Sequence, residues 1–237
     1  MKEVLAFALI VMLLLCGVAL AEAGEASCEI GSVYVFGAYE QDNNLTNGKE
    51  PIEWIIIGKR DDGGLVLMSK FALDATAYNT YRTDVTWETC TLRAWLNEDF
   101  YETAFSPDEK TKIAWVMIEN EDNPIHATAG GRPTQDKVWL LSISEAVDLV
   151  VTDRVYSYFT DDDLRMCAPT DYAIARHAYQ SIAYTVDGIG SCYWWLRSPG
   201  DSSEDAAYID TGGSVYTYGN FVSSNVIAVR PVICVLP

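Results

Sequence analysis

The sequence predicts an α+β domain, because strand-like and helix-like patterns occupy different parts of the chain. Apolar runs of strand length occur near both ends, and apolar residues at helical spacing occur in the first and middle parts. After Gly188 the pattern is that of strands and tight turns. We therefore expect about three helices and a strand-rich C-terminal third.

Several elements are expected in the first half of the chain. Alternation predicts a short strand over 31–37, and the runs 52–57 and 65–69 flank an Asp-Asp-Gly-Gly turn, which indicates a hairpin. Four large apolar residues at helical spacing predict a helix over about 91–101. Proline and glycine residues indicate a long loop over 119–135.

The remaining segments combine helix starts with strands. Ser106-Pro107-Asp108-Glu109 and Ser142-x-x-Glu145 are capping boxes, which predict two helix N-termini. A third helix is expected over 170–177. The segment 206–218 has the alternation of a hairpin around Gly212-Gly213, and 226–235 is an apolar strand-like run.

The first residues, 1–21, have the pattern of a secretory signal peptide. An early lysine precedes an apolar run from Val4 to Leu20, and Ala19-Leu20-Ala21 fits the small-x-small cleavage rule. The run is at the short end for a membrane span and no basic stop follows it, so cleavage is favoured over a retained anchor. We expect residues 22–237 to form a single domain, secreted or at the cell surface, that has no membrane contact after cleavage.

The chain is strongly acidic. It has 34 Asp and Glu residues against 16 Lys and Arg residues, a formal net charge of −18. Phosphate backbones and anionic membranes would repel such a protein, so we do not expect nucleic acid as a partner. Solubility is the simplest explanation of the acidity.

Cysteine pairing stays open on the sequence. Cleavage after Ala21 would leave an odd number of cysteines, so at least one thiol has no disulfide partner. A Cys28–Cys234 bridge is one possibility if the terminal strands pair, and buried thiols are expected at Cys90 and Cys167. No Cys-x-x-Cys spacing occurs, which argues against zinc ribbons and thioredoxin-like motifs. The cysteines concerned are Cys28, Cys90, Cys167, Cys192 and Cys234.

Several sequence blocks occur together in one family. In chain order they are Glu53-Trp54, Leu92-Arg93-x-Trp95-Leu96-Asn97-x-x-Phe100, Phe105-Ser106, Asp136-Lys137-Val138-Trp139-Leu140-Leu141-Ser142-x-x-Glu145-Ala146, Trp194-Trp195-Leu196-Arg197-Ser198-Pro199-Gly200 and Val229-Arg230-Pro231. On these blocks the chain resembles an uncharacterised exported domain family of bacteria, common in gut Firmicutes. The resemblance covers nearly all of residues 22–237. The chain departs from the family pattern at Cys90, where a serine that would cap the helix is more frequent.

The last third also resembles, more distantly, the C-type-lectin-like fold of formylglycine-generating enzymes and of diversity-generating-retroelement target proteins. This resemblance implies that the N- and C-terminal strands pair and that a loop-rich part displays a binding surface. The copper-binding cysteine pair of the formylglycine-generating enzymes does not align with cysteines of this chain, so copper is not implied.

The tryptophan pair lies on a predicted strand. Successive side chains of a strand point to opposite faces, so we expect one of Trp194 and Trp195 to pack inside and the other to cover a loop or face a ligand. Arg197 and Arg230 are expected to be structural, pairing with acids or carbonyls near the core. Pro199 and Gly200 would then begin the displayed loop.

Residues 201–225 have the composition of an antibody combining site. Tyrosine and phenylalanine stand among Ser, Gly, Asn and Asp, and tyrosine offers a large contact area at low cost in side-chain entropy. The alternative is a hairpin whose tyrosines cover its own core. The expected binding residues are Trp194, Trp195, Asp201, Asp205, Tyr208, Asp210, Tyr216, Tyr218, Asn220 and Phe221.

Catalytic and metal-binding signals are weak. The two histidines have no metalloprotease spacing, no nucleophile elbow or phosphate-binding loop occurs, and we assign no catalytic residue and no metal ligand. Paired acids such as Glu119/Glu121 or Asp201/Asp205 could serve a glycosidase. No cofactor is expected. Calcium at Asp161–Asp163 or in the loop 201–205 is an alternative, although neither matches an EF-hand.

The sequence therefore favours a secreted, non-catalytic recognition module for an extracellular protein or glycan. The alternatives are an exported hydrolase that uses loop carboxylates and a structural protein of the cell envelope. An enzyme would bring acids together in one deep pocket, whereas a recognition module would spread aromatic rings over a shallow face.

Overall fold

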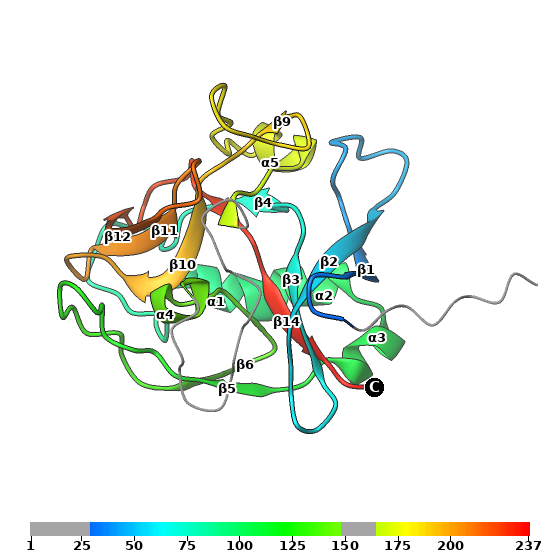
Figure 1. Cartoon of the computed structure of the whole chain (residues 1–237), viewed down its shortest axis with the longest axis horizontal. Coiled ribbons are helices and arrows are strands. Elements are labelled where there is room, and N and C mark those ends of the chain that lie inside the picture. Colours follow the sequence, from blue (N-terminus) through cyan, green and yellow to red (C-terminus); the bar gives the residue numbers. More distant parts are fainter. Residues whose placement is uncertain (1–28, 148–164) are drawn as a thin grey trace, which may run out of the picture.

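The computed structural model describes residues 29–147 and 165–237 (Figure 1). Within these residues the protein is α+β, as predicted, with two five-stranded sheets and two small two-stranded sheets. The predicted signal peptide and Asp161–Asp163 lie outside the described residues. No helix in the described part of the chain is both long and apolar enough to span a membrane.

The first sheet has the strand order β1-β2-β3-β14-β7. The strands are β1 (Val33–Tyr39), β2 (Glu50–Lys59), β3 (Leu65–Ser69), β14 (Val232–Val235) and β7 (Val138–Trp139). The predicted hairpin of 52–57 and 65–69 is confirmed as the antiparallel pair β2–β3.

The expected pairing of the first and last strands is wrong. β14 is hydrogen-bonded to β3 and β7, whereas β1 pairs with β2 at the edge of the sheet. All four residues of β14 are buried, so its backbone needs ladder partners on both sides. β1 exposes Val33 and Val35, which suits an edge position.

The second sheet has the order β12-β11-β10-β13-β4 and lies at the left of Figure 1. Its strands are β12 (Val215–Phe221), β11 (Asp205–Ile209), β10 (Trp194–Pro199), β13 (Ala228–Val229) and β4 (Asp74–Ala75). β11 and β12 form the predicted hairpin, and Asp210 Oδ1 accepts hydrogen bonds from the N–H groups of Gly212 and Ser214 in its turn. β10 is central and all six of its residues are buried.

The chain crosses between the two sheets at Arg230-Pro231. The predicted run 226–235 is divided, with β13 parallel to β10 in the second sheet and β14 in the first. Proline has no N–H to donate, so it interrupts the ladder at the crossing. Arg230 Nε donates to Ser69 O at 3.0 Å, and Pro231 O accepts from the Ser69 N–H at 3.0 Å. These bonds join the end of β3 to the crossing.

The predicted helix over 91–101 is present and extends to Ala104. It consists of α1 (Thr91–Trp95), the π-helical turn η1 (Leu96–Phe100) and α2 (Tyr101–Ala104). Cys90 takes the N-cap position, where its Sγ accepts a hydrogen bond from the Arg93 N–H at 3.4 Å. Burial raises the pKa of the Cys90 thiol to about 12, so the cap is a neutral thiol.

Three short helices follow: α3 (Pro107–Lys112), α4 (Ile143–Ala146) and α5 (Asp171–Ala175). Both predicted capping boxes form, at the starts of α3 and α4. α5 is shorter than the predicted 170–177, because His177 has the left-handed backbone angle φ +85° and ends the helix. With the continuous helix 91–104, four helical segments lie in residues 29–147 and 165–237.

The two small sheets are hairpins. β5 (Val116–Ile118) pairs with β6 (Thr134–Asp136), so the predicted loop 119–135 connects two strands and its last residues are part of β6. β8 (Thr185–Val186) pairs with β9 (Ile189–Gly190) near α5 at the top of Figure 1.

One cluster of buried residues connects both large sheets with the helix 91–104. It contains Cys90 and Cys167, which are buried and outside any disulfide, as expected. Cys28 lies outside the described residues, so the Cys28–Cys234 bridge stays a prediction.

Candidate functional site

Both tryptophans of β10 are fully buried. Trp194 Nε1 donates to Arg165 O at 2.9 Å, and Trp195 Nε1 donates to Thr76 O at 3.1 Å. The two rings do point to opposite faces, but β10 is covered on both. The expectation that one ring could face a ligand is therefore corrected: Trp195 covers the segment around Thr76, and neither ring is exposed.

Two arginines are buried as well: Arg197 within β10, and Arg230, which follows the neighbouring strand β13. Arg197 forms an ion pair with Glu145, the acid of the α4 capping box, and its Nη1 donates to Leu140 O at 2.8 Å. The Arg230 guanidinium lies 5.1 Å from the centre of the Trp194 ring. Their contacts are with the core and with main-chain carbonyls, so they hold β10 in place.

Six rings form a continuous row on the second sheet and its adjoining loops. We call this set the aromatic row: Tyr179, Tyr193, Tyr208, Tyr216, Tyr218 and His126. In that order the ring centres are 4.9, 5.5, 5.1, 6.1 and 4.4 Å apart. Tyr208 and Tyr216 are direct cross-strand partners of β11 and β12. Such distances are those of favourable aromatic pairs, so the row is one contiguous surface.

The row is accessible and carries hydroxyl groups. Tyr216 and Tyr218 are 44% and 58% exposed, Tyr179 is also exposed, and the other rings are half-buried. The pKa of Tyr208 is raised to about 12, mainly by burial and to a smaller extent by the neighbouring Tyr216. Burial also raises the pKa of Tyr193, and the nearby Asp210 carboxylate acts in the same direction on both hydroxyls. These hydroxyls therefore stay protonated at neutral pH and are available as donors.

Asn123 positions one end of the row. This buried side chain donates from Nδ2 to Pro199 O at 2.9 Å, Gly200 O at 3.1 Å and Thr217 O at 2.8 Å. Its Oδ1 accepts from the N–H of His126 at 3.0 Å. The loop 119–135 is thus fixed to the end of β10 and to β12, and His126 is placed against Tyr218. Pro199 and Gly200 anchor this loop through their carbonyl groups.

The sequence did not indicate all members of the row. Tyr208, Tyr216 and Tyr218 were expected binding residues, and the structure brings them together with Asp210 beside them. Tyr179, Tyr193, His126 and their support Asn123 were not expected to contribute. No local pattern marks them, because they come from segments that meet only in the folded chain.

The other four expected residues lie away from the 210–214 turn, at the opposite end of the β11–β12 hairpin. The Asp201 N–H donates to Tyr218 O at 2.9 Å, and Asp205 Oδ2 accepts from Ser202 Oγ at 2.5 Å. Asn220 Oδ1 accepts from the Phe221 N–H at 2.8 Å. The Phe221 ring is covered on one face by Arg82, whose guanidinium lies 3.6 Å from the ring centre. None of the four is a member of the row.

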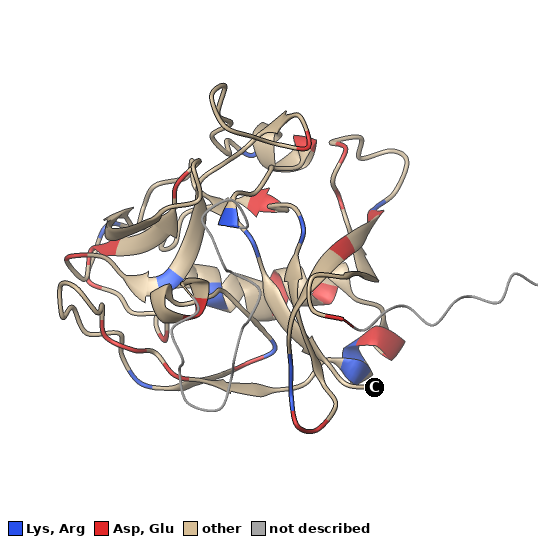
Figure 2. Ribbon diagram, viewed as in Figure 1, with Lys and Arg blue, Asp and Glu red and all other residues tan. Residues whose placement is uncertain are grey.

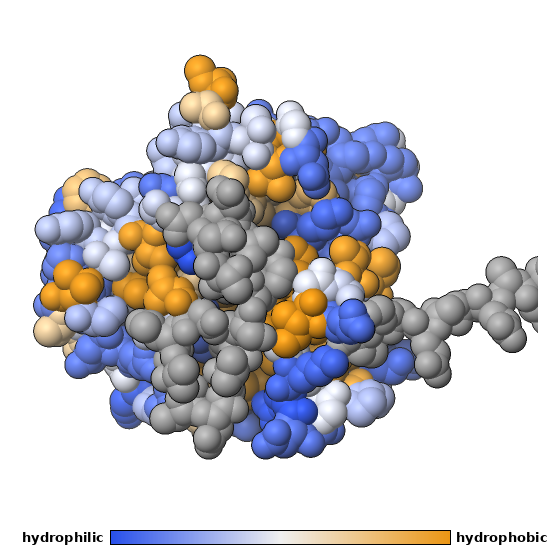
Figure 3. All heavy atoms as spheres, in the orientation of Figure 1, coloured by the Kyte–Doolittle hydropathy of each residue, from blue (hydrophilic) through white to orange (hydrophobic). Residues whose placement is uncertain are grey.

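An apolar projection adjoins the row on the side of Tyr179. Ile182 is 99% exposed in the loop that leads to β8, and Figure 3 shows apolar atoms at the top of the molecule, where this loop lies. Tyr184 and Ile189 are exposed in the same segment. A methyl group on Gly212 would lie 3.4 Å from the Tyr184 ring, so this ring stands over the β11–β12 turn.

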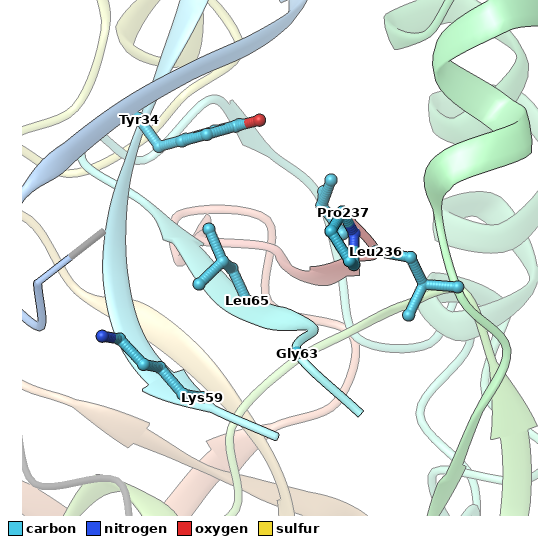
Figure 4. A pocket seen from close by; sticks show the side chains of 7 residues that line it. Tyr34, Lys59, Gly63, Leu65, Leu236 and Pro237 are labelled. Carbon is cyan, nitrogen blue, oxygen red and sulfur yellow. The ribbon is translucent and has the colours of Figure 1, made fainter. Parts of the chain in front are cut away.

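None of the acids that could serve an enzyme lines the pocket found among the described residues. A pocket of about 350 Å³ lies between the first sheet and the C-terminal residues (Figure 4). Its described lining consists of Tyr34, Lys59, Gly63, Leu65, Val235, Leu236 and Pro237, which include no Asp or Glu side chain. Glu119 is exposed at the end of β5, and Asp205 lies in β11.

Within the described ranges, one group of three acids has ligand atoms close enough to share a metal ion, namely Glu40, Asp42 and Glu50. These residues belong to the β1–β2 hairpin and not to the aromatic row. Asp201 and Asp205, which the sequence offered as calcium ligands, are not part of such a group among the described residues.

A family model described as a domain of unknown function, DUF6273, matches residues 62–237. The chain belongs to this family. The expectation of an uncharacterised domain family is confirmed, and the matched residues of this DUF6273 domain include the whole aromatic row. The match begins in the turn between β2 and β3, so the β1–β2 hairpin precedes it. Comparison with the curated proteins gives no match, and comparison with the solved structures gives none.

Proposed function

We propose that this DUF6273 domain is a non-catalytic recognition module that binds an extracellular protein or glycan through the aromatic row. The observation that carries the proposal is the contiguity of the six rings together with their exposure. A ligand that covers an exposed cluster of aromatic side chains removes apolar surface from water, which is favourable, so such a cluster is typical of a binding surface.

The exposure argues against a hairpin whose tyrosines only cover its own core. Tyr216 and Tyr218 leave about half of their surface open to solvent, whereas Ala207 and Ile209 of β11, on the face opposite Tyr208, are fully buried. Tyrosine rings offer flat surfaces for stacking on sugars or on peptide groups, and their hydroxyls add hydrogen bonds at low entropy cost. Asp210 supplies an acceptor beside them.

The rigidity of the support favours binding as well. The row is carried by two strands of a five-stranded sheet, and its His126 end is fixed by the buried Asn123. A surface that is already ordered loses little conformational entropy when it binds a ligand. The hydrolase alternative has less support, since none of the candidate acids lines the described pocket.

The proposal also includes the fold family and the location of the protein. We propose a C-type-lectin-like fold. The strand-rich C-terminal third, which carries the exposed row, supports it. The position of β1 at the edge of the first sheet, where it does not pair with β14, counts against it. We propose a secreted or cell-surface location on the basis of the signal-peptide pattern in residues 1–21.

Binding to glycan arrays and to extracellular protein arrays tests the function. The wild-type protein is expected to bind a ligand, and the Tyr216→Ala/Tyr218→Ala variant is expected to bind it at least about tenfold more weakly, because central aromatic residues contribute most of the binding energy at interfaces. Trp115→Ala is the matched control, since this exposed ring lies between α3 and β5, outside the row. Equal binding by the double variant and the wild type, with both folded, would refute the proposal.

A further inference from the structure

The hairpin loop between β1 and β2 brings three carboxylates together. Glu40 directly follows β1, Asp42 lies in the loop, and Glu50 is the first residue of β2. One carboxylate oxygen from each lies within 4.8 Å of the others. The loop is at the upper right of Figure 1, and Figure 2 shows acidic residues along it.

No described Lys or Arg side chain neutralises these acids. Neither Glu40, Asp42 nor Glu50 takes part in an ion pair within residues 29–147 and 165–237. Lys49 is adjacent to Glu50 in the chain, but its Nζ donates to Thr103 O at 2.5 Å. Three like charges at this separation repel one another unless a cation or a proton lies between them.

Glu40 provides the second, independent observation. Its side chain is only 9% exposed, and its Oε1 is fully buried and accepts no hydrogen bond from a described group. Buried polar atoms almost always have a partner, so this oxygen indicates one that residues 29–147 and 165–237 do not supply.

The other two carboxylates are held in position by the loop. Asp42 Oδ1 accepts from the Asn44 N–H at 2.8 Å, and its Oδ2 accepts from Asn47 Nδ2 at 2.7 Å. Glu50 Oε2 accepts from the Gln41 N–H at 2.7 Å. Glu50 Oε2 also accepts from the Asp42 N–H at 3.4 Å. A carboxylate oxygen has two acceptor sites, so both Asp42 oxygens, which accept one bond each here, and the second oxygen of Glu50 retain capacity for a metal ion.

We propose that Glu40, Asp42 and Glu50 form a Ca²⁺ site. The ligands are all oxygen atoms, which hard divalent cations prefer, and no cysteine or histidine of the described residues belongs to the group. Ca²⁺ accepts roughly six to eight oxygen ligands in flexible geometry, which suits carboxylates on a loop, whereas Mg²⁺ demands near-ideal octahedral geometry, so calcium is the better candidate. Water and loop oxygens would complete the coordination.

Calcium at this position would stabilise the first sheet and α5 together. Gln41 O accepts from the Tyr172 N–H at 3.0 Å, so the loop is bonded to the first turn of α5. A cation that fixes the loop also fixes this contact. The site is carried by the hairpin that precedes the family match, and it does not depend on ligand binding at the aromatic row.

Isothermal titration of the chelator-treated chain with CaCl₂ tests the proposal. We expect one site, and at a free Ca²⁺ concentration of one hundred times Kd we expect the melting temperature to rise by roughly 5–10 °C. Glu40→Gln and Glu50→Gln each remove one charge and keep a carbonyl oxygen, and each is expected to weaken binding by at least about tenfold. Glu98→Gln, an exposed acid in η1, is the matched control and should bind as the wild type does.

The proposal fails if the wild-type chain gives neither heat nor a change in melting temperature with CaCl₂. It also fails if both cluster variants bind Ca²⁺ as tightly as the wild type, which would place any binding elsewhere on this acidic surface. MgCl₂ that binds as tightly as CaCl₂ would overturn the choice of ion. The wild-type melting temperatures with Ca²⁺ and with EDTA give a result even if a variant does not fold.

Discussion

Replacing Asn123 by Ala tests how the His126 end of the aromatic row is supported. The substitution removes the Nδ2 donor from three main-chain carbonyls, those of Pro199, Gly200 and Thr217. It also removes the acceptor for the N–H groups of Ile125 and His126. The side chain is buried, so the groups that lose their partner cannot all be hydrated in its place.

The magnitude follows from the number of bonds lost. A typical hydrogen bond contributes about 1 kcal/mol net, and a buried group left without a partner costs about 1–3 kcal/mol. We expect Asn123→Ala to lower the free energy of unfolding by about 3–4 kcal/mol, measured by urea denaturation. The melting temperature should fall by roughly 6–16 °C for a domain of this size. Any ligand of the row should also bind more weakly, because His126 is no longer fixed against Tyr218.

Asn225→Ala is the matched control, since Asn225 is an exposed asparagine beyond β12. Its effect on stability should be within about 0.5 kcal/mol. A loss of less than about 1 kcal/mol for Asn123→Ala would refute the reasoning, because it would mean that the three carbonyls find other partners at no cost. A loss of stability without any effect on ligand binding would restrict Asn123 to a structural role.

Two further substitutions test the buried charges. Arg197→Met leaves the buried Glu145 without its ion pair and should lower the free energy of unfolding by about 3–5 kcal/mol in urea, whereas Arg132→Met, at an exposed pair with Glu88, should change it by less than about 1 kcal/mol. Equal effects of the two substitutions on the free energy of unfolding would contradict the conclusion that the Arg197–Glu145 pair is buried and the Arg132–Glu88 pair is exposed. Burial raises the pKa of the Asp74 carboxyl, so its contribution to stability is present below the unfolded-state pKa of about 3.9 and is lost as the pH rises through the higher folded-state value. Asp74→Asn should therefore reduce the fall in melting temperature between about pH 4 and pH 7, and an unchanged slope would contradict the reasoning.

Elements determined by local chemistry could be predicted from the sequence. The β2–β3 and β11–β12 hairpins, the helix from Thr91 and both capping boxes depend on residues within a few positions of one another, and all of them form. The pairing of β14 could not be predicted in this way. It depends on which distant strand offers a buried partner, and β3 and β7 do so where β1 was expected.

The candidate site shows the same division. Alternation placed Tyr216 and Tyr218 on one face of a strand, but the rings that extend the row come from the loop after α5, the residue before β10 and the loop 119–135. Alternation also predicted opposite faces for Trp194 and Trp195 correctly. It could not show that both faces of β10 are covered, because that depends on the packing of segments distant in the sequence.

The side chains that support the strands of the aromatic row are hydrogen-bonded to main-chain carbonyl groups. Asn123 binds carbonyl oxygens of Pro199, Gly200 and Thr217, and Tyr78 Oη donates to Arg197 O at 2.8 Å. A carbonyl group is present whatever the side chain, so these bonds do not constrain which residues stand at the exposed positions of β12. Side chains such as Tyr216 and Tyr218 can therefore change without loss of the bonds that hold the hairpin. The buried side chains of β10 and of Asn123 contribute to stability, whereas in the proposed function the exposed rings, which these main-chain bonds do not fix, would select the ligand.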